Sequence, residues 1–407
     1  MNQFQNSISK VEIQDFILSH ENDDVQKLLL KQKTVLGMPT EWIAQQITGR
    51  RKAKNKLPTW YAAPGIIFPP ALHLEQTSSE ATANFKSTIL RNRSTLPATS
   101  RDIGCGADLT GGFGIDTYFL SKHASQVEYV EPNIDLLEMA RHNHTILGAK
   151  NIVYHHASAE EFLRSHTKEL DFLFMDPSRR KGFRKVYGLA DSEPNVVRLQ
   201  SQFFQKATNV LIKTSPLLDL QQGCRELQHA TKVVVVAVEN ECKELLYLLN
   251  QEAVGDPAIE AVDLTRNGDV KESCSFTWNE EKNSEPDFSA PLDFIYEPNA
   301  AILKAGAFKW IARKFEVKKL APNTHLYTDG HQKSFPGRIF RVTEHVKLEK
   351  KLKARFRDSY VNILTRNYPI SVEEIKKKTG LKEGGDQYLI CTQTQKDKYV
   401  VVAERVS

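Results

Sequence analysis

Acidic residues and glycines near position 110 have the types and spacing of a loop that holds a nucleotide-type ligand. The segment reads Asp108-Leu-Thr-Gly-Gly-Phe-Gly114-Ile-Asp116. Glycine lets a backbone approach a ligand closely, and amides at the start of the next helix then face it. Glu131 follows Asp108 by 23 residues, near the roughly 20 that separate such a loop from an acid that accepts ribose hydroxyls. This spacing predicts ligand contacts by Asp108, Gly112, Gly114, Asp116 and Glu131, with a plain surface position at a strand end as the alternative for Glu131.

Two overlapping glycine motifs compete for this loop, because Asp102-Ile-Gly-Cys-Gly106 precedes the segment above. If the first motif were the loop, the following helix would have to begin through Gly111 and Gly112, which are poor helix residues. After the second motif, Ile115 to Lys122 can begin a helix at once. We therefore place the loop in the second register. The third glycine of an NAD pattern is replaced by Thr117, which disfavours a dehydrogenase.

A second group of candidate residues follows the apolar run Phe172-Leu-Phe-Met175, which ends in Asp176-Pro177-Ser178-Arg179-Arg180-Lys181. This predicts Asp176 at the carboxyl end of the fourth strand, next to the crevice in which such sheets bind ligands. Arg179, Arg180 and Lys181 begin a run of five cations within seven positions. The run either contacts substrate phosphates beside the crevice or is a solvated basic loop.

Three further features have more than one interpretation. Lys213, at the end of the predicted fifth strand, either reaches a substrate phosphate or carboxylate or forms a structural ion pair. Thr77 and Glu80 fit a capping box for a helix that runs to about Leu90. The twelve histidines show no metal-binding spacing and the five cysteines no CxxC pair, so neither a metal site nor a disulfide framework is predicted.

The surrounding pattern indicates the elements that position these residues. Residues 1–95 read as several short helices, such as Gln14–His20 and Asp24–Gln32. From about residue 100, short apolar runs alternate with helical segments, which is typical of a doubly wound, mostly parallel sheet. The predicted strands are Val127–Val130, Ile152–His155, Asp171–Met175, Asn209–Thr214 and Lys232–Val238.

The last third of the chain reads as a smaller α/β region. A polar segment with two prolines, Asn279–Pro291, is the predicted linker, and a helix is predicted near Ala300–Phe315. The last 70 residues predict a compact α/β module, with these elements: strand Arg338–Thr343, helix Lys347–Phe356, strand Tyr360–Thr365, helix Val372–Thr379 and the hairpin Tyr388–Thr392 with Tyr399–Glu404. Four domains are predicted, with the boundaries 1–96, 97–278, 285–334 and 335–407.

Length and composition exclude several classes of protein. A chain of 407 residues with 40% apolar content is too long for one ordinary core. The longest apolar run, Val233–Val238, is far short of the roughly 20 residues that span a bilayer, so no membrane protein is expected. The N-terminus lacks an apolar segment of signal-peptide length, so secretion is not expected either. A cytoplasmic protein is predicted, and its oligomeric state is left open.

Charge is distributed unevenly along the chain. Residues 301–407 hold 23 Lys and Arg against 11 Asp and Glu, a balance of +12, whereas the whole chain carries +5. A basic surface attracts polyanions such as nucleic acid through phosphate contacts and counterion release. The alternative is that these side chains only keep the chain soluble.

The Asp176 segment resembles class I S-adenosylmethionine-dependent methyltransferases that modify amino groups. Those enzymes carry Asp or Asn, then Pro-Pro and an aromatic residue, at this point. The resemblance implies that the Asp176 carboxylate and the Pro177 carbonyl accept hydrogen bonds from a target amine. This chain departs from the pattern at Ser178 and Arg179, so stacking of a base on an aromatic side chain is not implied.

A closer resemblance covers most of the chain. The segments that carry it are Glu75-Gln-Thr-Ser-Ser-Glu80, the Asp108 loop, Asp176-Pro-Ser-Arg-Arg, Tyr296-Glu-Pro-Asn-Ala-Ala, Phe335-Pro-Gly-Arg338 and Leu381-Lys-Glu-Gly-Gly-Asp386. They look like a bacterial family of class I methyltransferases with a helical N-terminal part, a Rossmann-like sheet, a ferredoxin-like insert and a THUMP-like C-terminal domain.

The family resemblance implies S-adenosylmethionine as cofactor and an RNA substrate, tRNA or rRNA, because THUMP domains bind RNA in tRNA-modifying enzymes. It also implies that the segment from residue 75 folds over the cofactor cleft. Many methyltransferases place a polar residue against the adenine where Ser158 stands, although Ser158 also fits a helix cap. The alternative function is an RNA-binding protein whose methyltransferase domain is degenerate and inactive.

Overall fold

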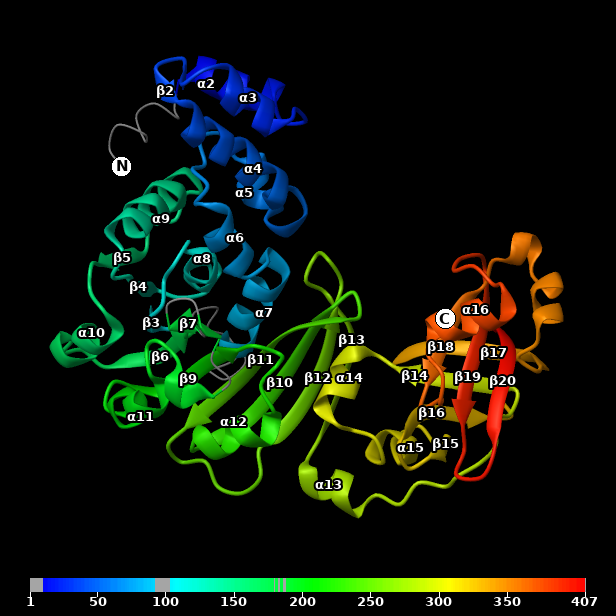
Figure 1. The fold of residues 1–407 in the computed structure, drawn as a ribbon. Helices are drawn as coiled ribbons and strands as arrows, with labels where there is room; N and C mark the ends of the chain where they lie inside the picture. The colour runs from blue at the N-terminus through cyan, green and yellow to red at the C-terminus, as the bar shows by residue number, and fades with distance from the viewer. Residues whose placement is uncertain (1–9, 92–102, 179, 182–183, 186–187, 407) are drawn as a thin grey trace. The chain divides into compact units, whose positions relative to one another are not determined.

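The computed structural model describes residues 10–91, 103–178, 180–181, 184–185 and 188–406 (Figure 1). The chain divides into two compact units. Unit 1 comprises residues 1–233, 243–255 and 264–269, and unit 2 comprises residues 234–242, 256–263 and 270–407. In the described part of the chain, every helix is too short or too polar to cross a membrane.

Unit 1 begins with a helical region that shares a hydrophobic core with the domain after it. Its helices are α2 (Val11–Ser19), α3 (Val25–Lys31), α4 (Thr40–Lys56), α5 (Pro58–Ala62), α6 (Ala71–Gln76) and α7 (Glu80–Arg91), with a two-residue pairing of β1 (Thr34–Val35) and β2 (Met38–Pro39). Trp60 is fully buried and packs on Tyr118 and Phe119 of the later helix α8 (Ile115–Ser121). The predicted helices near residues 14–20 and 24–32 are confirmed.

The chain contains a nine-stranded sheet in the order β13-β12-β10-β11-β9-β6-β3-β4-β5. Its strands are β3 (Cys105–Asp108), β4 (Gln126–Val130), β5 (Ile152–His155), β6 (Leu170–Met175), β9 (Ala207–Thr214), β10 (Ala230–Val238), β11 (Glu241–Asn250), β12 (Ala258–Leu264) and β13 (Val270–Phe276). Strands β9, β6, β3, β4 and β5 are neighbours in that order and run parallel, in agreement with the predicted mostly parallel sheet, and β11 is antiparallel to β9. The predicted strand Lys232–Val238 is part of β10. Strands β11, β12 and β13 were not predicted.

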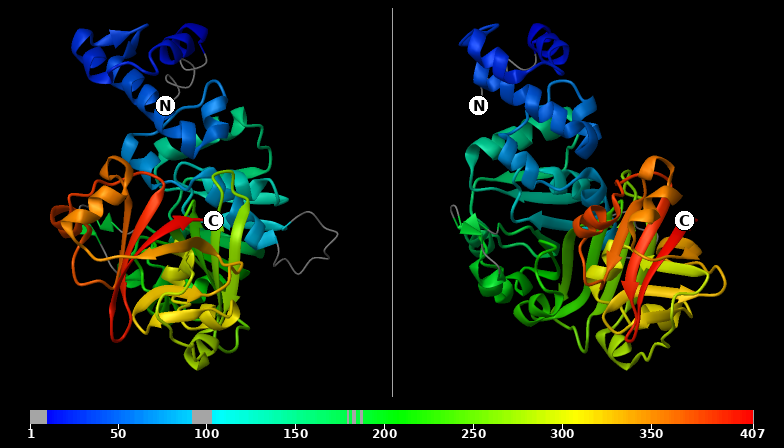
Figure 2. Two further views of the ribbon diagram at one scale, coloured as in Figure 1. Left: turned by 90° about the vertical axis from the view of Figure 1, so that its right-hand side faces the viewer. Right: turned by 45° about the vertical axis from the view of Figure 1, so that its right-hand side comes forward.

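The parallel strands reverse their order between β3 and β6, and in sheets of this kind ligands bind at the carboxyl ends of the strands beside such a reversal. Right-handed crossovers then place α8 and α9 (Ile134–Ile146) on one face, and α10 (Ala159–Ser165) and α11 (Val196–Phe204) on the other (Figures 1 and 2). Shorter elements are β7 (Arg180–Lys181), β8 (Arg184–Lys185), the 3₁₀ turn η1 (Leu189–Asp191) and α12 (Leu220–Glu226). The carboxyl ends of β3 and β6, where Asp108 and Asp176 stand, meet at this reversal.

Unit 2 contains a seven-stranded sheet in the order β15-β16-β14-β17-β20-β19-β18. Its strands are β14 (Phe294–Pro298), β15 (Lys318–Ala321), β16 (Thr324–Asp329), β17 (Gly337–His345), β18 (Asn362–Arg366), β19 (Gln387–Gln393) and β20 (Lys398–Arg405). The helices are α13 (Trp278–Asn283), α14 (Ala300–Ala305), α15 (Trp310–Lys314) and α16 (Val372–Thr379). The predicted C-terminal hairpin is confirmed by the antiparallel pairing of β19 with β20.

Three local predictions for these elements are wrong. The helix predicted over Lys347–Phe356 is two 3₁₀ segments, η2 (Lys350–Arg355) and η3 (Arg357–Ser359), in a run whose closely spaced cations repel one another. The helix predicted near Ala300–Phe315 is split, because Gly306 ends α14 with a φ of +80°. The predicted linker begins inside α13, which Thr277 and Glu280 start with a capping box.

The capping box predicted for Thr77 and Glu80 is also absent. The Glu80 carboxylate instead accepts hydrogen bonds from the Thr59 backbone N–H at 2.6 Å and the Thr59 hydroxyl at 2.7 Å. The Thr77 hydroxyl donates to the Leu74 carbonyl. A tertiary contact between α5 and α7 has thus replaced the local cap.

Candidate active site

The glycine loop is closed by Asp108, whose carboxylate is 1% exposed. One oxygen accepts a bond from the Thr110 backbone N–H at 3.0 Å, and the other accepts one from the Thr117 hydroxyl at 2.6 Å. Burial raises the pKa of Asp108 to about 7. Helix α8 begins at Ile115, which confirms the second of the two registers. Asp108 therefore shapes the loop through its own hydrogen bonds.

Two glycines of the loop are required by close contacts. A Cβ atom at Gly111 would lie 2.3 Å from the Tyr129 ring, and one at Gly114 would lie 2.6 Å from Nε2 of His144. Gly114 also has a φ of +84°, a conformation that L side chains rarely adopt. The Tyr129 hydroxyl donates a 2.6 Å hydrogen bond to the carbonyl of Gly112, and this bond holds the turn against strand β4.

Glu131 lies against this loop at the end of β4. Its two carboxylate oxygens accept bonds from the Gly112 and Asn133 backbone N–H groups, each at 2.8 Å. The side chain is buried, and burial raises its pKa above the usual value. A carboxylate has about four lone-pair sites, so each oxygen retains one acceptor position. The structure therefore brings Glu131 and Gly112 together, as a ligand held by both would require.

Asp176 lies at the end of β6 and is joined to the same loop. Its backbone N–H donates a 2.7 Å bond to the Thr110 hydroxyl. Its Oδ2 is paired with the Lys213 ammonium, from the end of the neighbouring strand β9. Pro177 is buried behind it. Of the two interpretations of Lys213, the ion pair is the one present in this structure.

A buried cluster of charges surrounds Asp116, in the first turn of α8. The Lys86 ammonium, from α7, lies 2.8 and 3.0 Å from the two carboxylate oxygens of Glu244 on β11 and 3.2 Å from Oδ1 of Asp116. The Ser78 hydroxyl donates to Oδ2 of Asp116 at 2.7 Å and accepts from Lys86 at 3.0 Å. Lys86 is 1% exposed and Glu244 is 2% exposed. The helical N-terminal region is thus anchored to the start of α8 by ions that water cannot solvate.

The other sequence-predicted residues have different positions. Ser158 starts α10 with a capping box, in which its hydroxyl and backbone N–H both bond to Glu161. Arg179 lies outside the described residues, and for Arg180 and Lys181 the structure describes the backbone strand β7 alone. Within the part of the chain that is described, no three His, Cys, Asp or Glu side chains are grouped to hold a metal ion.

Sequence reasoning missed several residues of this site. Thr110, Thr117 and Tyr129 hold the loop, but their roles depend on contacts with residues 66, 9 and 17 positions away in the chain. Ser78 lies within the Thr-Ser-Ser-Glu segment that carries part of the family resemblance, so that motif was a usable signal. Lys86 and Glu244 are 158 positions apart, and nothing local in the sequence links them.

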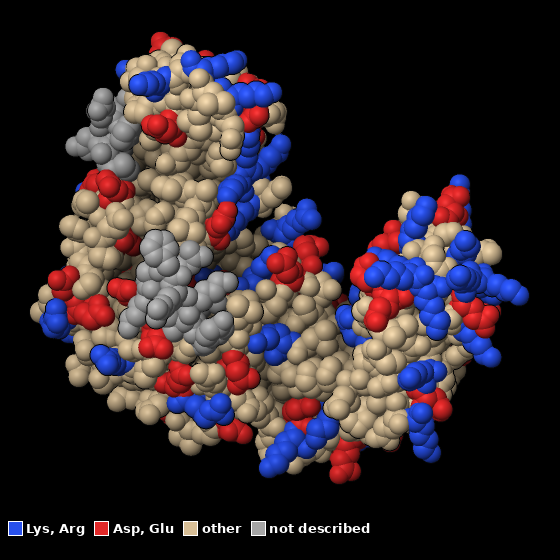
Figure 3. Space-filling model, in the orientation of Figure 1, with Lys and Arg blue, Asp and Glu red and all other residues tan. Residues whose placement is uncertain are grey.

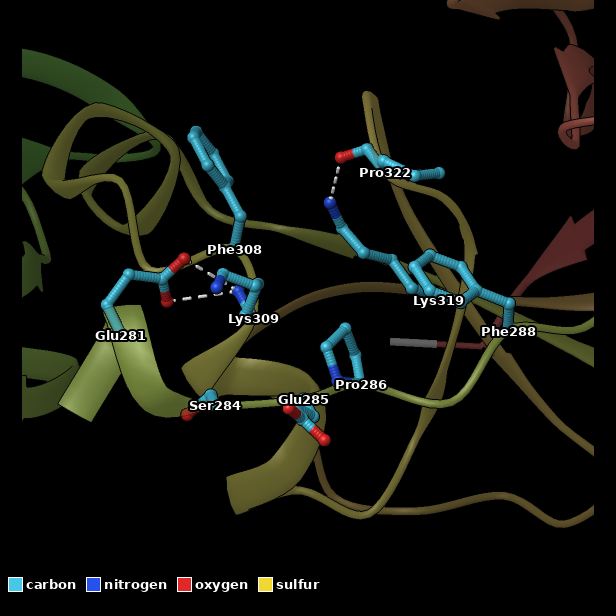
Figure 4. Close-up of a pocket in the computed structure, with 9 residues that line it drawn as sticks. All are labelled: Glu281, Ser284, Glu285, Pro286, Phe288, Phe308, Lys309, Lys319 and Pro322. Carbon is cyan, nitrogen blue, oxygen red and sulfur yellow. Dashed lines mark hydrogen bonds between the residues drawn. The ribbon is translucent and has the colours of Figure 1, made fainter.

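Unit 2 contains a separate cavity of about 450 Å³ (Figure 4). Pro286, Phe288, Phe308 and Pro322 give it an apolar lining. The Glu281 carboxylate accepts bonds from the backbone N–H groups of Lys309 and Trp310, and Lys319 donates to the Pro322 carbonyl. None of the sequence-predicted site residues lines this cavity.

Two family models match the C-terminal part of the chain. Residues 294–336 match a ferredoxin-like domain, and residues 337–405 match a THUMP domain-like family. A search of the curated proteins finds no match.

Among solved structures, the chain is similar over its whole length to a putative methyltransferase from Porphyromonas gingivalis W83. The identity is 29%, the match covers 98% of each chain and the TM-score is 0.83. A putative methyltransferase from Streptococcus mutans, in complex with SAH, is 16% identical over 42% of this chain and 97% of its own, with a TM-score of 0.30. An rRNA methylase from Streptococcus thermophilus is 11% identical over 41% and 93%, also at 0.30. The two lower scores do not establish a shared fold.

We predict that Lys86→Met destabilises the protein strongly. The substitution leaves Glu244 and Asp116 buried without their cation, and breaking a buried ion pair in this way costs about 3 to 5 kcal/mol. Lys52→Met is the matched control, because Lys52 and its partner Glu75 are 36% and 60% exposed and such pairs contribute at most about 1 kcal/mol. The free energy of unfolding in urea measures both. Equal losses in the two variants would contradict the assigned role of Lys86.

Proposed function

We propose that this chain, a member of the bacterial class I methyltransferase family with ferredoxin-like and THUMP-like C-terminal domains, transfers a methyl group from S-adenosylmethionine to a base amine of tRNA or rRNA. The observation that carries the proposal is the convergence of three features at one strand-order reversal. These are the Asp108 loop, Glu131 and Asp176, joined through Gly112 and Thr110.

The residues around the loop fit the cofactor. Asp116, in the first turn of α8, is proposed to contact the cofactor's α-ammonium; its Oδ1 makes no hydrogen bond and is paired with Lys86 at 3.2 Å. Glu131 retains lone pairs for both ribose hydroxyls. The space beside Gly112 is open, because a Cβ placed there would meet only the Thr110 carbonyl, at 3.7 Å. Ser158 is proposed on the adenine side, with its hydroxyl and amide engaged in the α10 cap.

Asp176 and Pro177 are proposed to orient the target amine. An exocyclic base amine has a poorly available lone pair, so two acceptors that fix its hydrogens align the nitrogen for attack. When bound, S-adenosylmethionine would supply a methyl carbon on a sulfonium. The target nitrogen would gain a C–N bond and release one proton to water, and S-adenosylhomocysteine would leave with the electron pair of the broken C–S bond. The Asp176 carboxylate stabilises the positive charge that develops on the amine.

RNA binding is proposed for the basic surfaces of the chain. Exposed lysines of the THUMP-like range lie on α16 (Lys377 and Lys378) and on η2 (Lys350, Lys351 and Lys353), which packs against α16. Figure 3 shows many Lys and Arg side chains, with Asp and Glu side chains among them, over this part of unit 2. Arg179, Arg180 and Lys181 are proposed to contact substrate phosphates close to Asp176. Such a substrate implies action in the cytoplasm.

The experiment that tests the function is single-turnover methyl transfer, with tritiated cofactor, to total RNA from cells that lack this protein. Asp176→Ala should abolish transfer and leave cofactor affinity nearly intact. Asp176→Asn should keep part of the rate, because its amide oxygen still accepts a hydrogen bond. Full activity in Asp176→Ala would contradict the assignment. RNA binding by the wild type without any transfer would instead favour the inactive, degenerate scaffold.

We predict that Glu131→Ala weakens S-adenosylhomocysteine binding at least about tenfold, since hydrogen bonds to a charged group contribute roughly 1.5 to 3 kcal/mol each. Calorimetry measures the affinity, and circular dichroism verifies the fold. Asp135→Ala, an exposed acid four residues along the chain, is the matched control and should bind as wild type does. Unchanged affinity in a folded Glu131→Ala protein would exclude the ribose contact.

We predict that Lys377→Glu/Lys378→Glu weakens binding to total tRNA and lowers the slope of log Kd against log salt by about 2, one for each lost phosphate contact. The double variant Lys396→Glu/Lys398→Glu makes the same charge change at the turn between β19 and β20, away from α16. Fluorescence anisotropy at several salt concentrations compares the two. A larger effect in the turn variant would place the RNA contact elsewhere.

A further inference from the structure

The carboxylate of Asp176 is held at two points. Met175 pairs with Ile212 in the parallel ladder of β6 and β9, so the next residues, Asp176 and Lys213, emerge side by side at the carboxyl edge of the sheet. Lys213 takes Oδ2 of Asp176, and the Thr110 hydroxyl holds the Asp176 backbone N–H. No described residue donates a hydrogen bond to the other oxygen, Oδ1. These two contacts therefore leave Oδ1 of Asp176 for a ligand.

Lys213 is itself held in a charged state. Its side chain is 13% exposed, and burial opposes its charge, but the carboxylates of Asp176, Glu244 and Asp116 outweigh burial and raise its pKa. Glu244 cannot turn away, because both of its oxygens are bound to Lys86. Charges of alternating sign thus run from Asp176 through Lys213 and Glu244 to Lys86 and Asp116.

We infer that Lys213 is a positioning residue, which fixes the Asp176 carboxylate in the orientation that presents Oδ1 to the target amine. This inference rests on the proposed function. It differs from a direct grip of Lys213 on substrate phosphate, because the ammonium already has a carboxylate partner and is largely covered.

The test is a double-mutant cycle on methyl transfer to total RNA from cells that lack this protein. Lys213→Met should lower the single-turnover rate on the order of 100-fold, the cost of a misplaced reacting group, without changing half-saturation by RNA. Lys213→Arg should recover much of that rate, since a guanidinium also binds a carboxylate. Combined with Asp176→Asn, Lys213→Met should cost no more than about a further twofold, because the two residues act as one group.

Lys206→Met is the matched control, because Lys206 precedes the opposite end of β9 and donates to the His166 carbonyl. It should retain the wild-type rate. S-adenosylhomocysteine affinity and the thermal unfolding midpoint verify that each variant is folded. A wild type that transfers no methyl group refutes the proposed function itself. An active wild type with a normal rate in Lys213→Met, a change confined to half-saturation, or fully multiplicative losses in the cycle would overturn the role of Lys213 alone.

Discussion

Unit 1 depends on the requirement that carboxylates buried at the carboxyl edge of a parallel sheet find partners. An ionised carboxylate without a partner is unstable in an apolar interior, so each one is hydrogen-bonded to a donor or paired with a cation. Asp108 accepts hydrogen bonds from Thr110 and Thr117, and Glu131 accepts one from the Gly112 amide. Glu244 is paired with the Lys86 ammonium. These contacts connect the glycine loop, the strand ends and α7 into a single arrangement.

The candidate active site results from the same requirement. Thr110 serves two acids at once, because its backbone N–H binds Asp108 while its hydroxyl accepts from the Asp176 amide. The loop proposed to hold the cofactor and the carboxylate proposed to hold the amine are therefore one hydrogen bond apart. Two reacting groups must be aligned closely for methyl transfer, and a direct link of this kind supplies that alignment.

A buried carboxylate in unit 2 also has charged partners, and there it joins two parts of one sheet. Glu297, at the end of β14, is 3% exposed and pairs with Arg338 of β17 and Arg366 of β18. Glu297 lies in the ferredoxin-like range and both arginines lie in the THUMP-like range. Strand β17 also continues the sheet from β14, and a Cβ at Gly337 would meet the Glu297 carbonyl at 2.1 Å. The two matched ranges therefore form one sheet.

The sequence by itself determined the features that depend on residues close together in the chain. Apolar runs separated by helical segments predicted β10 and four of the five parallel strands (β4, β5, β6 and β9), and the poor helix propensity of Gly111 and Gly112 selected the correct loop register. The spacing of Asp108, Glu131 and Asp176 placed all three at strand ends. The tertiary structure alone decided the partners of these acids. Lys86 contacts Glu244 across 158 positions, Lys213 pairs with Asp176, and Glu80 accepts hydrogen bonds from Thr59 in place of a local cap. Periodicity reports which face of an element is buried, whereas the pairing of buried charges depends on which elements become neighbours.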